Sequence, residues 1–283
     1  MIAPDLDVLA GRVAVVTGGS RGIGRALVLA LARAGVAVVV AGKSETENPQ
    51  LPGTIHSVAG EVRALGGRAL PIRTDVRDEA AVEALIGRTV EEFGRIDIVI
   101  SNAGALWWEQ VTDTPPKRYD LMWQVNVRAA FLAAYYALPH MVSQGWGHLL
   151  TNSPAITTTP SPGMAAYMTT KMGMTRLQLG IAAEHLVDNV AANALWPAAP
   201  IDTAATRNWG SAKMGEPAQW RRPEIYVDAA MQILTSEPRT CTGRMVTDEE
   251  ILTERGWSAQ DLDGYWLTGR APDSPLWIDG RIG

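Results

Sequence analysis

Short runs of β-branched residues alternate with longer helical patterns along most of this chain. The clearest runs are 12–17, 36–41 and 96–101, each mostly apolar and too short for a globular helix. Such runs are typical of parallel strands that are covered on both faces. Their alternation with helices predicts βαβ units, and hence an α/β fold with a doubly wound parallel sheet and helices on both faces.

The same alternation extends to the end of the regular pattern. Further strands are expected at 69–74, 147–152, 190–195 and 243–247. Helices are expected from the first strand to about Ala34, and at about 54–66, 78–93, 115–141, 164–186 and 223–236. Residues 197–221 have an irregular pattern, and 248–283 would form a C-terminal extension. Ligands of parallel sheets bind beyond the carboxyl ends of the strands, so the loops there are candidate sites.

Composition narrows the class of protein. The length of 283 residues suits one sizeable core, and the net charge of -5 without a Lys/Arg tract argues against a nucleic-acid partner. The single cysteine, Cys241, excludes an intrachain disulfide, and the sequence also contains no Cys/His cluster for zinc. No apolar stretch is long enough to span a membrane, and Asp5 and Asp7 stand where a signal peptide carries basic residues. We expect one cytoplasmic domain over 1–283, with no metal and no membrane span.

A glycine-rich loop, Thr17–Gly24, lies between the first expected strand and the first helix. Its glycines would let backbone N–H groups approach a pyrophosphate at the helix N-terminus, where the helix dipole favours anions. A tight strand–helix turn is the alternative interpretation of glycines alone. The flanking strand and helix favour dinucleotide binding. The residues expected to contact the dinucleotide here are Gly18, Ser20, Arg21, Gly22, Ile23 and Gly24.

The end of the second strand indicates which dinucleotide binds. An NAD enzyme usually has an acidic side chain there, which holds the ribose 2′-OH. This chain has Lys43 instead. Lys43 and Arg21 could bracket a 2′-phosphate, which favours NADP(H) over NAD(H). Two solvated surface cations are the alternative.

Two further strand ends carry candidate cofactor residues. The Asp75 carboxylate, followed by Val76, could accept a hydrogen bond from an adenine amino group. Asn102, Ala103 and Gly104 end the fourth strand, where small residues would admit the adenosine half. Each alone could be an ordinary turn, but their places at successive strand ends support one another.

Tyr167 and Lys171 are four residues apart in an expected helix, so they share one face. A cation beside the phenol of Tyr167 would favour phenolate and lower its pKa toward the working pH. Tyr167 could then exchange a proton with the oxygen of a carbonyl or an alcohol, and Lys171 could also reach a nicotinamide ribose. A surface Tyr–Lys pair is the alternative.

Together these segments resemble the short-chain dehydrogenase/reductase family. The matching segments, in the family's order, are TGGSRGIG, the Asp75 turn, NAG at 102–104, Asn126, YMTTK at 167–171 and Trp196-Pro197. The resemblance implies one Rossmann-like domain, with its core over 12–247, and nicotinamide-dependent oxidoreduction. It implies Tyr167 as general acid/base, Lys171 as its activator and Asn126 as a link in a water-mediated proton relay. It also implies a homodimer or homotetramer.

The chain departs from this family at two places. The family usually has Asn-x-Ser-Ser after the fifth strand, where the second Ser orients the substrate oxygen, but Pro154 stands there in this chain. Either Ser153 replaces that serine as a catalytic residue, or another hydroxyl such as Thr157 does, or the site lacks the group. The usual Pro-Gly after the sixth strand is Pro197-Ala198. The residues that could still contact the nicotinamide and the phosphates are Pro197, Ile201 and Thr203.

The substrate is expected to be apolar. Segments such as 49–55 and 193–197 resemble a hydroxysteroid dehydrogenase-like group of the family, usually associated with lipid metabolism. The family also implies that 197–221 covers the substrate. The large side chains that could line an apolar pocket are Trp107, Trp108, Trp196, Trp209, Trp220, Met164, Met168 and Met214; plain core packing is the alternative for several of them.

The leading hypothesis is an NADP-dependent oxidoreductase that interconverts a carbonyl and an alcohol on a small or lipophilic substrate. Hydride would pass between nicotinamide C4 and the carbonyl carbon, while Tyr167 handles the proton. A non-catalytic dinucleotide-binding sensor or scaffold protein is the alternative, which Pro154 favours slightly. Reduction of a carbon–carbon double bond is a third hypothesis; enoyl reductases of this superfamily usually separate their Tyr and Lys more widely.

Overall fold

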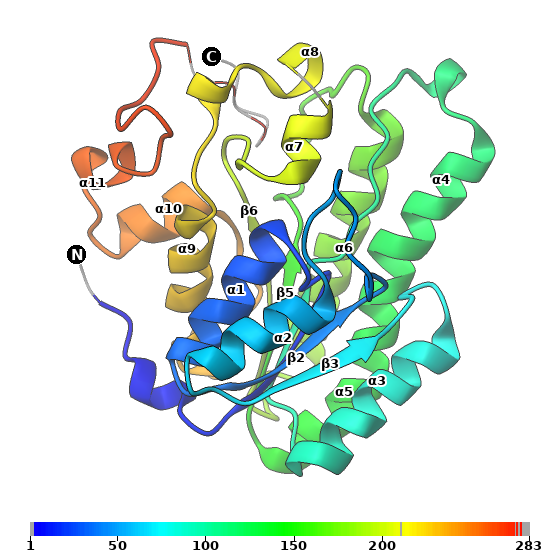
Figure 1. Ribbon diagram of the computed structural model, residues 1–283, viewed down its shortest axis with the longest axis vertical. Coiled ribbons are helices and arrows are strands. Elements are labelled where there is room, and N and C mark those ends of the chain that lie inside the picture. Colours follow the sequence, from blue (N-terminus) through cyan, green and yellow to red (C-terminus); the bar gives the residue numbers. More distant parts are fainter. Residues whose placement is uncertain (1–2, 210, 275, 277, 279–283) are drawn as a thin grey trace.

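Seven parallel strands form one sheet through the centre of the molecule (Figure 1). The computed structural model describes residues 3–209, 211–274, 276 and 278. The sheet order is β3-β2-β1-β4-β5-β6-β7, and every neighbouring pair is parallel, which confirms the predicted doubly wound sheet. The strands are β1 Val13–Thr17, β2 Ala37–Gly42, β3 Ala69–Arg73, β4 Ile98–Ser101, β5 Gly147–Asn152, β6 Val190–Trp196 and β7 Met245–Thr247.

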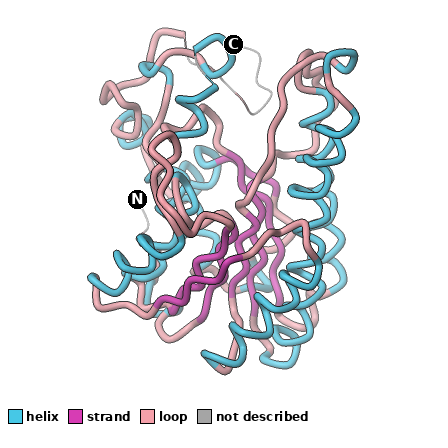
Figure 2. Tube along the Cα trace, turned by 45° about the vertical axis from the view of Figure 1, so that its right-hand side comes forward, coloured by secondary structure: helices cyan, strands magenta, loops and turns pink. Residues whose placement is uncertain are grey.

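Helices cover both faces of the sheet, as predicted (Figure 2). Alternate residues of a central strand point into different helical layers; Val16 packs into one apolar cluster and Val15 into the other. Both faces of the strands are therefore buried, which explains their continuous apolar runs. One layer contains α1 (Gly22–Arg33), α2 (Ile55–Ala64) and α9 (Glu224–Leu234), and the other contains α3 (Glu79–Phe93), α5 (Ala129–Gln144) and α6 (Ala165–Glu184).

The helix expected at 115–141 is interrupted by a π-helical turn. α4 (Pro116–Met122) passes into this turn at Trp123–Arg128, and α5 follows it. Asn126 in the turn is buried, and its side-chain amide exchanges two hydrogen bonds with the backbone of Ala105, at 2.9 and 3.0 Å. The turn thus joins this helix to the loop after β4. Apolar periodicity did not predict it, because the contact is tertiary.

The segment 197–221 is less irregular than expected. It contains two short helices, α7 (Ala204–Trp209) and α8 (Ser211–Met214). The chain beyond β7 adds two more, α10 (Asp248–Glu254) and α11 (Ala259–Asp263).

A buried arginine joins the segment 197–221 to the residues that follow β7. Arg221 is 1% exposed and forms ion pairs with Asp248 and Glu249 of α10. Its guanidinium also lies 4.2 Å from the ring centroid of Trp266. These contacts hold the chain after β6 against the C-terminal part of the molecule.

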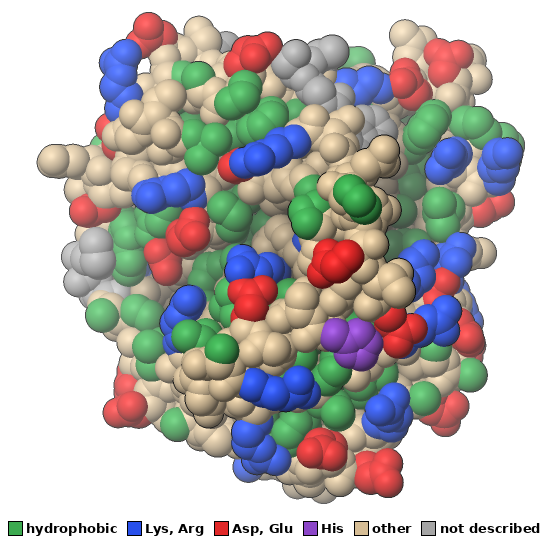
Figure 3. Space-filling model, in the orientation of Figure 1, with side chains coloured by type: hydrophobic (Ala, Val, Ile, Leu, Met, Phe, Trp, Pro, Cys, Tyr) green, Lys and Arg blue, Asp and Glu red, His purple; other side chains and the backbone are tan. Residues whose placement is uncertain are grey.

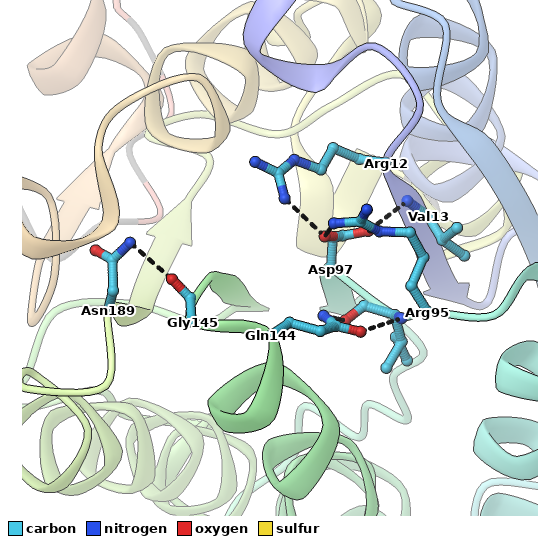
Figure 4. A network of polar contacts seen from close by, with 8 residues as sticks. Arg12, Val13, Arg95, Asp97, Gln144, Gly145 and Asn189 are labelled. Atoms are coloured by element: carbon cyan, nitrogen blue, oxygen red, sulfur yellow. Dashed lines mark hydrogen bonds and ion pairs between the residues drawn. The ribbon is translucent and has the colours of Figure 1, made fainter.

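A buried carboxylate joins the amino ends of the central strands (Figure 4). Asp97, immediately before β4, is fully buried. It accepts hydrogen bonds from Val13 N–H at 2.9 Å, Arg12 Nη1 at 3.0 Å and Arg95 Nε at 2.8 Å. The Gln144 side chain, at the end of α5, exchanges two hydrogen bonds with the backbone of the residue before Asp97. These contacts place β4 beside β1.

The distribution of surface charge and the character of the helices can be compared with the partners expected from the sequence, which include neither nucleic acid nor a membrane. Basic and acidic side chains are interspersed over the face shown in Figure 3. In the described part of the chain, no helix is long and apolar enough to cross a membrane. Those residues also contain no group of three or more His, Cys, Asp or Glu side chains that could hold a metal ion.

Asp97→Asn is expected to lower the free energy of unfolding by about 2 kcal/mol, because the buried group loses its charge while the Val13 N–H and the partly exposed Arg12 and Arg95 still face it. The affinity for the dinucleotide that the glycine-rich loop predicts should not change, because Asp97 lies at the opposite, amino edge of the sheet. Chemical denaturation and tryptophan quenching measure the two quantities. The control is Glu254→Gln, which breaks an exposed ion pair with Arg244 and should cost less than about 1 kcal/mol. Equal losses in the two variants would contradict this account.

Candidate active site

The carboxyl ends of the strands border a cavity of about 520 Å³. Strand order reverses between β1 and β4, and crevices form at such a reversal in parallel sheets. The lining comes from the ends of β1, β2, β3 and β4 and from the segment after β6. Of the expected dinucleotide ligands, it contains Gly18, Ser20, Arg21, Gly22, Ile23, Gly24, Lys43, Asp75, Val76, Asn102, Ala103, Gly104 and Thr203.

The glycine-rich loop has a backbone that side chains would disrupt. Gly22 has φ of +55°, in the left-handed region. A Cβ atom on Gly24 would lie 2.2 Å from the carbonyl oxygen of Gly18. α1 begins at Gly22 without a side-chain cap, so its first backbone N–H groups are available to an anion. This loop fits the pyrophosphate of a dinucleotide.

Hydrogen bonds tie the loop after β1 to the end of β4. Thr17 Oγ1 accepts from the backbone N–H groups of Asn102 and Ala103, both at 3.1 Å. The Asn102 side chain donates back to Thr17 O, also at 3.1 Å. Asn102 therefore fixes the width of the crevice, while the small Ala103 and Gly104 line the cavity beside it.

Both expected phosphate-binding cations line this cavity. Arg21 Nη2 donates to Ser44 Oγ at 2.6 Å and to Gly53 O at 2.9 Å. The Arg21 Nε atom is buried without a partner among the described residues, and burial lowers the pKa of this guanidinium. Lys43 is largely exposed, and its Nζ lies 4.0 Å from Asp75. An additional anion beside Arg21 and Lys43 would therefore be favoured.

Asp75 lies where an adenine ring is expected, but it already has a partner. Its Oδ1 accepts from Arg77 Nε at 2.9 Å and from the Arg77 backbone N–H at 3.1 Å. The Arg77 hydrogen bonds, with a smaller contribution from Lys43, lower the pKa of Asp75 to about 2. Asp75 therefore remains ionised at neutral pH and can accept a further hydrogen bond.

Tyr167 and Lys171 line a second cavity, of about 210 Å³. This cavity adjoins the first, because Ile23, Asn102 and Thr203 line both. Lys171 Nζ lies 6.0 Å from the Tyr167 ring centroid and 5.4 Å from the Trp196 ring. It donates a hydrogen bond to the backbone carbonyl of Asn152, at the end of β5. The other residues in the lining are Gly104, Ala105, Leu106, Trp108, Pro197, Pro200, Ile201, Ala205, Thr206, Met214 and Ile278.

Burial dominates the charges of the Tyr–Lys pair. It raises the pKa of the Tyr167 phenol and lowers the pKa of Lys171 to about 7. The direction for Tyr167 is opposite to the one that the sequence led us to expect. The reason is that Tyr167 packs among Met122, Met168 and Trp196, where phenolate is poorly solvated. The protonated phenol is therefore the stable form in this environment.

The structure does not bring the two candidate hydroxyls to this cavity. Ser153 is fully buried and hydrogen-bonds Thr151 and Thr175, both at 2.8 Å. Thr157 bonds Thr159 at 2.9 Å. Neither Ser153 nor Thr157 belongs to the lining of either cavity. The third alternative, a site without the family's hydroxyl, therefore agrees best with the geometry.

The segment after β6 lines the second cavity without the family's glycine. Pro197, Ile201 and Thr203 are all in its lining. Ala198 N–H donates to the buried Asp248 carboxylate at 3.0 Å, and Ala198 O accepts from Ile278 N–H at 2.9 Å. These contacts, made by residues far along the chain, fix the backbone where a glycine is usual.

The large side chains divide between cavity and core. Trp108, Trp196 and Met214 line the second cavity. Trp108 meets Tyr167 edge to face, with ring centroids 5.9 Å apart. Trp220 is buried instead, and its Nε1 donates to Met214 O at 2.7 Å. Trp107, Met164 and Met168 belong to the apolar cluster around Tyr167, and the Trp209 side chain lies outside the described residues.

Sequence reasoning missed several residues at this site, among them Asn152, Asp248 and Ile278. Asn152 stood at an expected strand end, the signal that identified Asp75 and Asn102, so it could have been found. Asp248 and Ile278 reach the site through contacts with Ala198, 50 and 80 positions earlier. No local pattern marks such a long-range contact.

The fold, the glycine-rich loop and the Tyr–Lys pair define an NAD(P)-dependent oxidoreductase. The chain belongs to the short-chain dehydrogenase family, whose model, described as "short chain dehydrogenase", matches residues 12–214. The predicted family membership is thus confirmed.

The more specific resemblance is also confirmed. The chain is similar to hydroxysteroid dehydrogenase-like protein 2 of Xenopus tropicalis, with 40% identity over 278 residues. The match covers 98% of this chain and 64% of the relative. The human protein of the same name is 39% identical over 274 residues, 96% of this chain and 64% of its own length. The chain thus spans a little under two thirds of these relatives.

Solved structures share the fold. A Xanthomonas campestris protein is 43% identical, with a TM-score of 0.86 over 93% of this chain and 96% of its own. A short chain dehydrogenase of Mycobacterium thermoresistibile is 40% identical, with a TM-score of 0.83 over 91% of each chain. A metagenomic short-chain oxidoreductase in complex with NADP is 26% identical, with a TM-score of 0.69 over 85% of this chain and 98% of its own.

Lys171→Met is expected to stabilise the cofactor-free protein most at low pH. The folded-state pKa of about 7 lies below the ordinary value of 10.5, so between these values the unfolded chain binds more protons. The stability that comes with deprotonation is present above pH 10.5 and lost as the pH falls to about 7. The shift from 10.5 to about 7 corresponds to roughly 5 kcal/mol. Thermal unfolding of both proteins from pH 6 to 10 measures it; a difference that does not shrink with rising pH would contradict the assignment.

Proposed function

We propose that this protein is an NADP-dependent oxidoreductase that interconverts a carbonyl and an alcohol on a small, apolar substrate. The observation that carries the proposal is the pair of adjoining cavities. One is lined by the glycine-rich loop and two cations, and the other by Tyr167 and Lys171. A dinucleotide held along the first would bring its nicotinamide end toward the second. Family membership and this pairing support an enzyme rather than a sensor or scaffold protein.

The residues of the first cavity fit an NADP molecule. Gly24 lets the start of α1 pack closely against Gly18, which keeps the backbone of the loop in place for a pyrophosphate, and Arg21 Nε, which has no partner among the described residues, is a donor for an anion. Arg21, Lys43 and Ser44 would hold the 2′-phosphate, and Asp75 would accept from the adenine amino group. Lys171 would bind the nicotinamide ribose, while Ile201 and Thr203 would contact the carboxamide and the phosphates. When bound, the nicotinamide supplies or accepts the hydride.

Tyr167 would act as the general acid in the reducing direction. Burial keeps its phenol protonated, so a proton is available when negative charge develops on the substrate oxygen. The nearby Lys171 would stabilise the phenolate that remains. The pKa of Lys171 is about 7, so the side chain is only partly charged at neutral pH. A bound anion nearby would favour the charged ammonium, and the charged ammonium would stabilise the Tyr167 phenolate more strongly. In the oxidising direction the same pair would accept the proton. Asn126 would take part in a water-mediated relay behind Lys171.

The walls of the second cavity support an apolar substrate. Leu106, Trp108, Trp196, Met214 and Ile278 supply most of its large side chains. The segment 197–221 would cover the substrate, as part of a catalytic core over 12–247 with 248–283 as an extension.

Exposed aromatic side chains on the π-helical turn and α5 support a homo-oligomer; they are Trp123, Phe131 and Tyr135. The cytoplasmic location stays a prediction.

Lys43→Gln is expected to weaken NADPH binding about tenfold, because one charge-assisted contact to the 2′-phosphate is lost. NADH binding should change little, since NADH lacks that phosphate. Quenching of tryptophan fluorescence measures both affinities. The matched control is Lys117→Gln, at an exposed position on α4. A wild-type protein that prefers NADH would disprove the NADP assignment while leaving the enzyme proposal intact.

Tyr167→Phe is expected to reduce turnover of apolar aldehydes and ketones by at least about a hundredfold, because the proton donor is removed. The affinity for NADPH should stay within twofold of the wild type. NADPH absorbance follows the reaction, and Tyr135→Phe, at a side chain that is 61% exposed, is the control. Turnover retained by Tyr167→Phe would rule out its role as acid/base.

A further inference from the structure

The side-chain oxygen of Asn152 is a buried polar atom at the second cavity that has no hydrogen-bond partner among the described residues. Asn152 is the last residue of β5 and belongs to the lining that contains Tyr167 and Lys171. Its Oδ1 atom is buried and accepts no hydrogen bond from any described residue. A buried acceptor without a partner costs about 1–3 kcal/mol, so such a group is stabilised by a ligand that satisfies it.

The alternation of β5 separates Asn152 from its hydroxyl neighbours. The side chains of Thr151 and Ser153 hydrogen-bond one another, and Ser153 also bonds Thr175 of α6. Neighbouring residues of a strand point to opposite faces, so the Asn152 side chain points away from this hydroxyl cluster. The face of β5 that carries the Asn152 side chain is the face that borders the second cavity.

Lys171 fixes the position of Asn152 beside the Tyr–Lys pair. The Lys171 ammonium donates to the backbone carbonyl of Asn152, and the same ammonium lies 6.0 Å from the Tyr167 ring. Asn152, Tyr167 and Lys171 all line one cavity of about 210 Å³, so a single small ligand bound there has both the Asn152 amide and the Tyr167 phenol within the same walls.

We propose that Asn152 binds the reacting oxygen of the substrate, together with Tyr167, and so supplies the contact that Pro154 cannot make. An amide suits this role in both directions of reaction. Its N–H groups donate to a carbonyl oxygen, and its Oδ1 accepts from an alcohol. A rotation about χ2, a torsion with broad preferences, presents either end to the cavity. This inference rests on the proposed carbonyl/alcohol function.

Asn152→Leu tests the proposal, with 4-nitrobenzaldehyde and cyclohexanone as probes and NADPH as reductant. The variant keeps the approximate volume and loses both hydrogen-bonding ends. We expect kcat to fall at least tenfold while the NADPH affinity stays within twofold, because the contact strengthens as charge develops on the oxygen. Asn152→Ser, which keeps a donor and an acceptor, should recover part of the loss. Thr169→Ala, at an exposed residue of α6, is the control.

The outcomes separate this inference from the proposed function. Wild-type turnover that Asn152→Leu leaves unchanged would overturn the role of Asn152 and leave the enzyme proposal standing. A loss seen only as weaker NADPH binding would assign the amide to the cofactor and overturn the inference. A comparable loss of kcat in Thr157→Val, with Asn152→Leu unaffected, would give the role to that hydroxyl. A wild type that binds NADPH but reduces neither probe would count against both proposals.

Discussion

The parallel pairing of β1 with β4 is the constraint on which the rest of the site depends. The sheet grows outward from β1 to β3 and then returns to β4, so neighbouring central strands lie far apart in sequence. Asp97 joins their amino ends with bonds to Arg12, Arg95 and the backbone of Val13. Thr17 and Asn102 join their carboxyl ends. The crevice at the reversal is thereby held at a fixed width beside the glycine-rich loop.

Burial is the second constraint, and it sets the chemistry. The apolar cluster around Tyr167 and Lys171 favours the neutral form of each. A protein that buries two titratable groups in this way gives up stability for reactivity, as active sites commonly do. The C-terminal residues contribute to the same enclosure, because Asp248 and Ile278 hold the chain after β6. The site is therefore assembled from nearly the full length of the chain.

Much of this arrangement could be predicted from the sequence. The continuous apolar runs predicted a parallel sheet, and the segment 147–152 is a strand with the predicted bounds. The residues at successive strand ends do meet in one cavity, because parallel strands all end at the same edge. Three expectations failed, one of which concerns the segment 197–221, where two short helices replace the expected irregular chain. The long helix at 115–141 contains a π-helical turn, and burial raises rather than lowers the pKa of Tyr167.

The sequence alone determined the fold class, the dinucleotide loop and the Tyr–Lys pair, since each follows from periodicity or from spacing within a few residues. Tertiary structure decided what long-range contacts control. It placed Ser153 with Thr175 and away from the cavity, and it set Asp248 against Ala198. It also left the Asn152 side-chain oxygen at the cavity with no partner among the described residues. Which way a side chain faces, and how strongly burial acts on its charge, depends on elements that are adjacent only after the chain has folded.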